Sequence, residues 1–239
     1  VFNITFTTPA AERERLTRQA IAAYDAGDSA GLMGQAQAAI AADQTDVVHD
    51  LLAHLAQRMI DLNKAKQTEV RRFLGWLEGR LKIQPKNDET GIDSLKGKSI
   101  IQNYLGDYQK GAGPVGWRDF HYRLHENRGR YAVALSDVEG QIEQEYEKTL
   151  QTLLPIKADL SRTDALIDKI VYRLYGLSDA EIELIERPQY EQALTEAKAQ
   201  VVANAKLTDD EEKLTLIAEG MLPAAERFFE RIEPTSIEA

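Results

Sequence analysis

The hydrophobic positions along this chain recur mainly at helical spacing. Apolar side chains at i, i+3, i+4 and i+7 form one face of an α-helix, and this pattern predicts a mostly α-helical, multi-helix domain with one or two long helices. The longest stripe starts near Asp43 or Thr45 and comprises Val48, Leu51, Leu52, Leu55, Met59, Leu62 and Ala65, with an extension to Leu77. About 30 residues at 1.5 Å each give a rod of about 45 Å.

Shorter helices are expected on both sides of this rod. One follows Pro9 and ends at Gly27, and the next starts at Asp28 or Ser29. Farther on, Ser136 or Asp137 begins a long helix through Leu154, and Pro155 is expected to end or kink it. Additional helices are predicted over 190–205, 208–220 and 221–232.

The residues 161–186 predict a tight helix-turn-helix corner. Ser161 or Thr163 can cap its first helix, and Gly176 can end it because glycine adopts the left-handed conformation without a Cβ penalty. Ser178 and Glu181 then have the spacing of a capping box for a second helix. The capping residues, the glycine and the capping box in this stretch all predict the same arrangement of two helices joined by a turn.

The residues around 83–131 predict an irregular stretch or minor β structure. Pro85 to Gly91 is rich in loop-forming residues, and Gly111 to Gly116 is the most glycine-rich segment. The latter lacks the Gly-Lys-Ser/Thr ending of a phosphate-binding loop, so we do not expect a nucleotide there on the motif alone. The chain therefore divides into a helical segment 1–82, an irregular segment 83–135 and a helical segment 136–239, or forms one domain.

Composition narrows the class of protein. The 239 residues include no cysteine and no apolar run long enough to span a bilayer, so we expect a cytoplasmic chain without a membrane partner. The first residue is Val, which leads us to expect part of a longer polypeptide or a processed chain. A formal charge of −10 argues against a free-standing, non-specific nucleic-acid binder, because such affinity comes mainly from neutralising phosphates.

The positive charge is concentrated in two segments. Residues 58–82 and residues 96–131 each carry seven Lys or Arg against three Asp or Glu. This asymmetry indicates a binding face on an acidic body, or the solvated side of ordinary helices. The candidate DNA-binding residues are Lys64, Lys66, Arg71, Arg72, Arg118, Arg123, Arg128 and Arg130.

Aromatic residues alternate with Arg and His between Trp117 and Tyr131. Such interleaving suits a nucleic-acid surface, which needs guanidinium groups for phosphate and flat rings for stacking. The alternative is a helix that buries its aromatic and aliphatic residues and leaves its basic residues in water. His121 and His125 have a spacing found in helical zinc sites, but the sequence offers no third ligand.

The corner resembles a known protein family. Val-Tyr-Arg-Leu-Tyr-Gly-Leu-Ser followed by Asp-Ala-Glu-Ile-Glu-Leu-Ile-Glu is similar to a segment near the C-termini of adenine-specific DNA methyltransferases of restriction–modification and related phage-defence systems. These include fused enzymes that both cut and methylate. The resemblance covers about 25 residues. It implies a parent enzyme that uses S-adenosylmethionine, acts on double-stranded DNA and carries its catalytic domain elsewhere.

The chemistry of that family is missing from this chain. The Asn-Pro-Pro-Tyr type motif does not occur, and no glycine-rich turn for S-adenosylmethionine is recognisable. We therefore expect no catalytic residue, cofactor or metal in the chain. The predicted function is a non-catalytic helical segment that supports target recognition or clamps DNA. The competing prediction is an acidic scaffold for protein–protein interaction. One merged positive groove would favour DNA, whereas scattered charges ringed by carboxylates would favour the scaffold.

Overall fold

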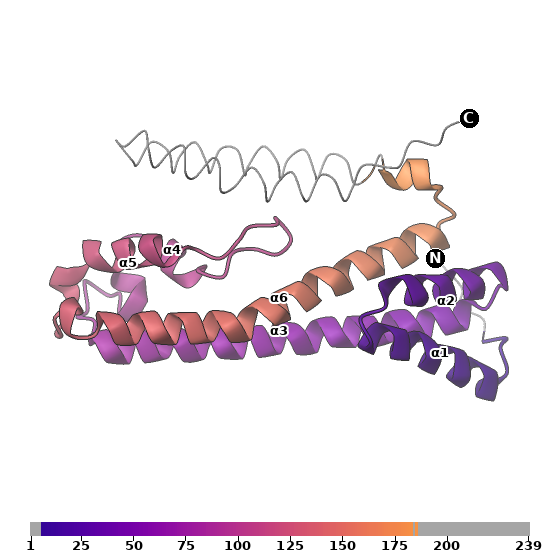
Figure 1. Ribbon diagram of the computed structural model, residues 1–239, viewed down its shortest axis with the longest axis horizontal. Coiled ribbons are helices and arrows are strands. Elements are labelled where there is room, and N and C mark those ends of the chain that lie inside the picture. The colour runs from indigo at the N-terminus through magenta and orange to yellow at the C-terminus, as the bar shows by residue number, and fades with distance from the viewer. Residues whose placement is uncertain (1–5, 184, 186–239) are drawn as a thin grey trace. The chain divides into compact units, whose positions relative to one another are not determined.

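Two long antiparallel helices form the frame of the protein (Figure 1). The computed structural model describes residues 6–183 and residue 185, and the chain divides into two units, Val1–Glu183 and Leu184–Ala239. The fold below is that of the first unit. The helices predicted over 190–205, 208–220 and 221–232 lie outside the described residues.

The frame consists of α3 (Thr45–Leu81) and α6 (Glu139–Leu174). At 37 residues, α3 is longer than the predicted rod and measures about 55 Å. Arg72 contacts Glu145 and Arg80 contacts Gln141, so the two helices run in opposite directions. The prediction of a mostly α-helical domain with long helices is confirmed.

Helices α1 (Ala10–Asp25) and α2 (Ser29–Ala41) pack on the first part of α3 and the last part of α6 (Figure 1). Asp28 caps α2 by accepting a hydrogen bond from Gly31 N at 2.8 Å, as its position predicted. This end is held by an alanine-rich core comprising Ala20, Tyr24, Leu32, Ala36, Ala39, Val47, Val48, Leu51, Leu55, Leu166 and Ile170. The alanines at three of these positions let the helices approach closely.

The segment between the long helices folds over their other end (Figure 1). It contains the short helices η1 (Gly91–Ser94), α4 (Lys98–Gln102), α5 (Trp117–Glu126), η2 (Arg128–Arg130) and η3 (Leu135–Asp137). Within the described residues, its β structure is limited to two isolated bridges, Ile83↔Tyr131 and Lys86↔Glu89. The predicted irregular stretch with minor β structure is therefore a set of short helices and turns.

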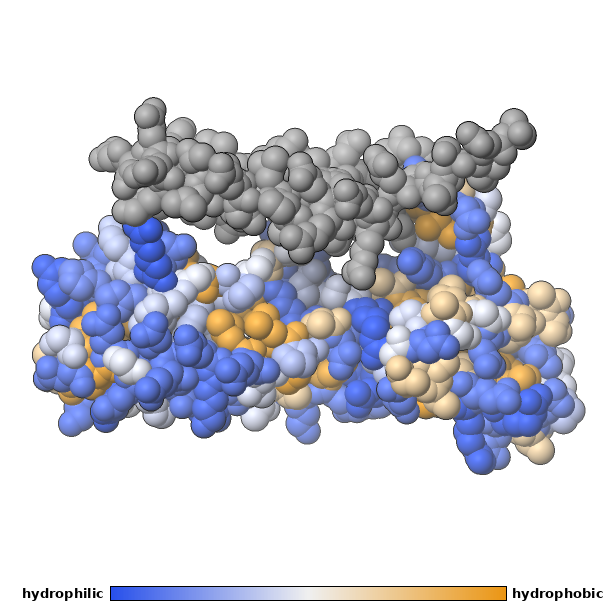
Figure 2. All heavy atoms as spheres, viewed as in Figure 1, coloured by the Kyte–Doolittle hydropathy of each residue, from blue (hydrophilic) through white to orange (hydrophobic). Residues whose placement is uncertain are grey.

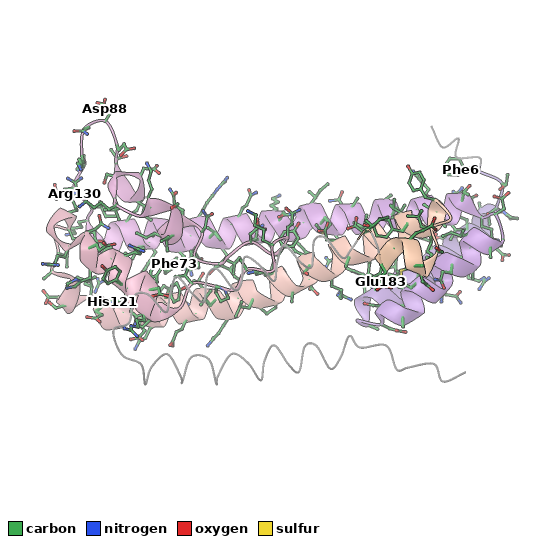
Figure 3. All side chains as sticks on the ribbon, turned by 90° about the horizontal axis from the view of Figure 1, so that it is seen from above. Phe6, Phe73, Asp88, His121, Arg130 and Glu183 are labelled. Atoms are coloured by element: carbon green, nitrogen blue, oxygen red, sulfur yellow. The ribbon has the colours of Figure 1, made fainter. Side chains whose placement is uncertain are left out.

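An aromatic core holds this end together. Phe73 of α3 lies 5.0 Å from Tyr104 and 6.0 Å from Phe120, measured between ring centroids. Tyr146 of α6 stacks on Phe120 at 4.5 Å, and all four rings are buried. Phe73 marks this core in Figure 3. Phe120 and Trp117 of α5 pack in or against this core, whereas Tyr122 of the same helix is exposed.

Of the two effects predicted for Pro155, an end of the helix at Leu154 does not occur, because α6 continues through Pro155 to Leu174. Thr163 is not a cap either. It is buried, with its Oγ1 2.7 Å from the Tyr24 hydroxyl and donating to Asp159 O at 2.6 Å. Figure 1 shows α6 diverging from α3 over its second half, and Pro155 lies near the middle of the helix. Packing against α1 and α2 maintains the helix beyond the proline.

The corner forms at its predicted end. Gly176 has φ +71°, Leu177 N donates to Tyr172 O at 3.0 Å, and Gly176 N donates to Arg173 O at 3.0 Å. These two bonds make a Schellman motif. Ser178 N donates to Glu181 Oε2 at 2.8 Å, and Glu181 N donates to Ser178 Oγ at 3.4 Å, which completes the capping box.

Candidate functional site

A basic cavity of about 710 Å³ opens beside the middle of α3. Its wall comes from three parts of the chain that are distant in sequence. The lining residues are Asn63, Lys66, Gln67, Val70 and Arg71 from α3, Lys157 from α6, and Gln102, Asn103, Leu105, Gly106, Asp107, Tyr108, Gln109 and Lys110 from the segment between the long helices. The α3 residues follow helical spacing, so they lie on one face.

The loop of residues 103–116, which we call the central loop, forms the opposite wall. Gly106 has φ +72°, and a Cβ there would lie 2.1 Å from Gly113 O, so only glycine fits. Val115 N donates to Tyr104 O at 2.7 Å, and Ala112 N donates to Asp107 O at 2.9 Å. These internal bonds give the loop a defined shape.

Lys157 attaches the central loop to α6. Its Nζ donates to Leu105 O at 2.7 Å and also to Ala112 O. Burial lowers the pKa of Lys157, while the nearby Asp107 carboxylate opposes that shift. The lysine therefore holds two backbone carbonyls that would otherwise lack a donor at this place.

The cavity carries a concentration of positive charge. Four basic side chains line it against one carboxylate, Asp107, although the whole chain has a net charge of −10. Lys66 Nζ lies 5.4 Å from the centroid of the Tyr108 ring, a cation–π arrangement. Arg71 and Lys110 are exposed and have no ion pair among the described residues. Their charges are available to an anion.

The α3 candidates from the sequence separate into two groups. Lys66 and Arg71 line the basic cavity. Arg72 instead faces α6 and forms an ion pair with Glu145 of that helix at 2.6 Å and another with Glu69 of its own helix at 2.7 Å. These carboxylates raise the pKa of Arg72, although burial opposes the shift. Lys64 is exposed on α3 and does not line the cavity.

The remaining candidates lie on α5 and η2 and do not line the cavity. Arg123 pairs with Glu126 at 2.7 Å, Arg128 lies 3.4 Å from His125 Nδ1, and Arg130 donates to Gln84 O at 2.6 Å. Arg118 is exposed. In Figure 3, Arg130 lies toward the loop that carries Asp88, and His121 lies on the opposite side of this end. The eight candidates thus do not merge into one groove.

The sequence candidates did not include Tyr108, Lys110 and Lys157, which also line the cavity. Lys110 belongs to the second basic segment, so local charge could have identified it. Lys157 lies 52 and 45 positions from the two carbonyls it binds, and no local pattern marks it.

A second, smaller cavity of about 270 Å³ lies between α1, α2 and α3. Its lining is mostly apolar and includes Leu16, Ala38, Ala39, Ala42 and Val48. Figure 2 shows pale, apolar surface over α1 and α2 and mostly blue, hydrophilic surface over α4 and α5. No Lys or Arg lines this smaller cavity, so it offers no cation to an anionic ligand.

The described residues contain no group of His, Asp and Glu side chains arranged to hold a metal ion. His121 Nε2 lies 3.1 Å from Glu139 Oε1, so this side chain of α5 contacts α6. Within residues 6–183, no helix combines the length and apolar character needed to cross a bilayer. Comparison of the chain with protein-family models, curated proteins and solved structures finds no match.

Proposed function

We propose that this chain is a non-catalytic helical part of a restriction–modification type DNA adenine methyltransferase, in which it binds duplex DNA and helps to position it. The contact is made to phosphates, because the available groups are ammonium and guanidinium ions. Contacts of this kind fix the register of a protein on DNA without reading its sequence. The catalytic domain and S-adenosylmethionine belong to the parent enzyme.

The basic cavity carries this proposal. Lys66 and Arg71 from α3 and Lys110 from the central loop meet Lys157 from α6 on an otherwise acidic chain. A concave surface on which positive charge predominates concentrates its field and attracts an anion. Lys157 is engaged with the central loop, so Lys66, Arg71 and Lys110 supply the charges that contact phosphate.

The similarity of the corner to the methyltransferase segment supports the choice of parent enzyme. The similar segment includes Gly176, which has a positive φ at the turn, and Ser178 and Glu181, which form the capping box. This turn is a local structural feature and contacts no DNA in our proposal. DNA positioning rests on the cavity instead.

Binding of the 239-residue chain to a blunt duplex tests the proposal. Fluorescence anisotropy between about 50 and 200 mM salt gives the slope of log K against log salt, which falls by about 0.9 when one phosphate interaction is removed. The Arg71→Gln/Lys110→Gln variant should bind more weakly, with a slope reduced by up to about 2. The matched control Lys86→Gln/Lys169→Gln removes the same charge from exposed positions outside the cavity that also have no ion pair among the described residues, and it should leave the slope unchanged.

The competing function, a protein-interaction scaffold, is favoured by a different observation. Arg72 and Arg123 are paired with carboxylates, so the positive surface outside the cavity is broken up. Equal salt slopes for the cavity variant and the control variant would support the scaffold and remove the DNA function.

A further inference from the structure

We propose that the basic cavity is a binding site for a single nucleotide whose base is unpaired. This inference rests on the proposed DNA function and names the ligand that the cavity takes. A surface that contacts only the phosphates of a duplex needs no groups other than cationic side chains. The basic cavity also offers an aromatic ring and free amide groups.

The size and rigidity of the cavity suit a small ligand. Its volume of about 710 Å³ lies within the range of roughly 300–1,000 Å³ that is usual for small-molecule sites. The wall formed by the central loop is held by Lys157 and by the bond from Val115 N to Tyr104 O. A site built before the ligand arrives loses less conformational freedom on binding.

Each part of a nucleotide has a matching group. Arg71 and Lys110 are exposed cations without ion pairs among the described residues, and they fit the phosphate. The half-buried Tyr108 ring provides a stacking surface for a base, an interaction that any base can make. Lys66 Nζ lies 5.4 Å from the centroid of this ring and brings a further cation beside it.

The amides supply the hydrogen bonds to the base edge. The side chains of Gln67 and Asn103 line the cavity and make no hydrogen bond within the described residues. Each amide presents a donor and an acceptor, which is the pattern that pairs with the edge of a base. A paired base would have its own edge occupied, so the ligand is an unpaired nucleotide of a strand or a free nucleotide.

The test compares a blunt duplex with the same duplex carrying a short single-stranded overhang, both added to the 239-residue chain. The overhang should strengthen binding by roughly 5- to 100-fold, as stacking of one base supplies. Tyr108→Leu should abolish this preference, which is measured as the ratio of the affinities of the variant for the overhang duplex and the blunt duplex. Tyr108→Phe retains the ring and should keep the preference. Circular dichroism checks that each variant is folded. Asn103→Ala is a second variant, which should weaken the preference for the overhang duplex without altering the loop.

Competition distinguishes the two sources of the nucleotide. If dAMP binds in a Tyr108-dependent manner and the overhang gives no preference, the ligand is a free nucleotide. If inorganic phosphate competes as well as dAMP, or if Tyr108→Leu keeps the overhang preference, the inference is overturned. It is also overturned if neither the overhang nor dAMP binds better than blunt duplex and phosphate. None of these results tests duplex binding, which is decided separately by the salt slope of the Arg71→Gln/Lys110→Gln variant.

Discussion

The Nζ atom of Lys157 lies 2.7 Å from the carbonyl oxygen of Leu105, a residue 52 positions earlier in the chain. The same amine also donates to Ala112 O. One side chain of α6 therefore holds two points of the central loop and fixes the wall of the basic cavity. The position of Tyr108, between these two points, depends on this attachment.

Lys157→Met should destabilise the protein and loosen the central loop. The change leaves two backbone carbonyls without their donor, and an orphaned buried polar group costs about 1–3 kcal/mol. Urea unfolding measures this cost, and hydrogen exchange at Ala112 and Val115 should become faster. The control Lys148→Met, at an exposed position of the same helix, should change stability by no more than about 0.5 kcal/mol. Equal exchange rates in both variants would show that the loop does not depend on Lys157.

Asp46 should make stability depend on acid pH. This buried carboxylate accepts bonds from Thr8 N at 2.9 Å, Thr8 Oγ1 at 2.6 Å and Val47 N at 3.0 Å. Burial raises the pKa of Asp46, but these hydrogen bonds outweigh it and hold the pKa below its ordinary value of 3.8. Its contribution is therefore complete at neutral pH and is lost as pH falls below about 3.8 toward the folded-state pKa.

The Asp46→Asn variant tests this dependence. At neutral pH it should be less stable than the wild type by about 1–3 kcal/mol, because the amide cannot accept the same set of bonds. Urea unfolding at pH 7 and at about pH 3 should show the difference narrowing, since the wild-type carboxylate becomes protonated. A constant difference at both pH values would mean that Asp46 does not titrate as its hydrogen bonds imply.

Gly176→Ala should cost about 1 kcal/mol, because alanine is strained at a φ of +71°. No atom lies within 4 Å of the position that a Cβ would take, so no clash adds to this penalty. Gly75→Ala is the matched control: it lies on the exposed face of α3, also without neighbours, and should stabilise by up to about 1 kcal/mol. If the melting temperatures of both variants shifted in the same direction, strain at the positive φ of Gly176 would not explain the effect.

Leu174→Ala should cost less than the roughly 2–5 kcal/mol of a fully buried leucine. Leu174 is only partly buried where it packs against the alanine-rich core. Denaturant unfolding measures the difference, with Leu166→Ala as the buried comparison in the same helix. A larger destabilisation by Leu174→Ala than by Leu166→Ala would place the corner inside the core.

Two double variants separate the basic cavity from α5 as the DNA-binding surface. Arg123→Gln/Arg128→Gln should reduce the salt slope less than Arg71→Gln/Lys110→Gln, because Arg123 is already paired with Glu126 and Arg128 lies beside His125. Removing one phosphate interaction changes the slope by about 0.9. If the α5 variant had the larger effect in anisotropy titrations, the phosphates would bind on α5 and not in the cavity.

The sequence by itself determined the helical character and several helix ends. Asp28, Gly176, Ser178 and Glu181 act through bonds to residues a few positions away, so their roles can be read from local spacing. The α3 face with Lys66 and Arg71 follows from helical periodicity in the same way. Short-range geometry suffices for such features.

Only the tertiary structure decided how far α6 extends and where the cavity lies. Thr163 lies inside α6 because it packs against Tyr24, 139 positions earlier, and not at the helix start that its residue type indicated. Lys157 meets the central loop 45 and 52 positions away, which brings Lys110 and Tyr108 opposite α3. Interactions over such separations depend on how the helices pack, and local propensity carries no information about them.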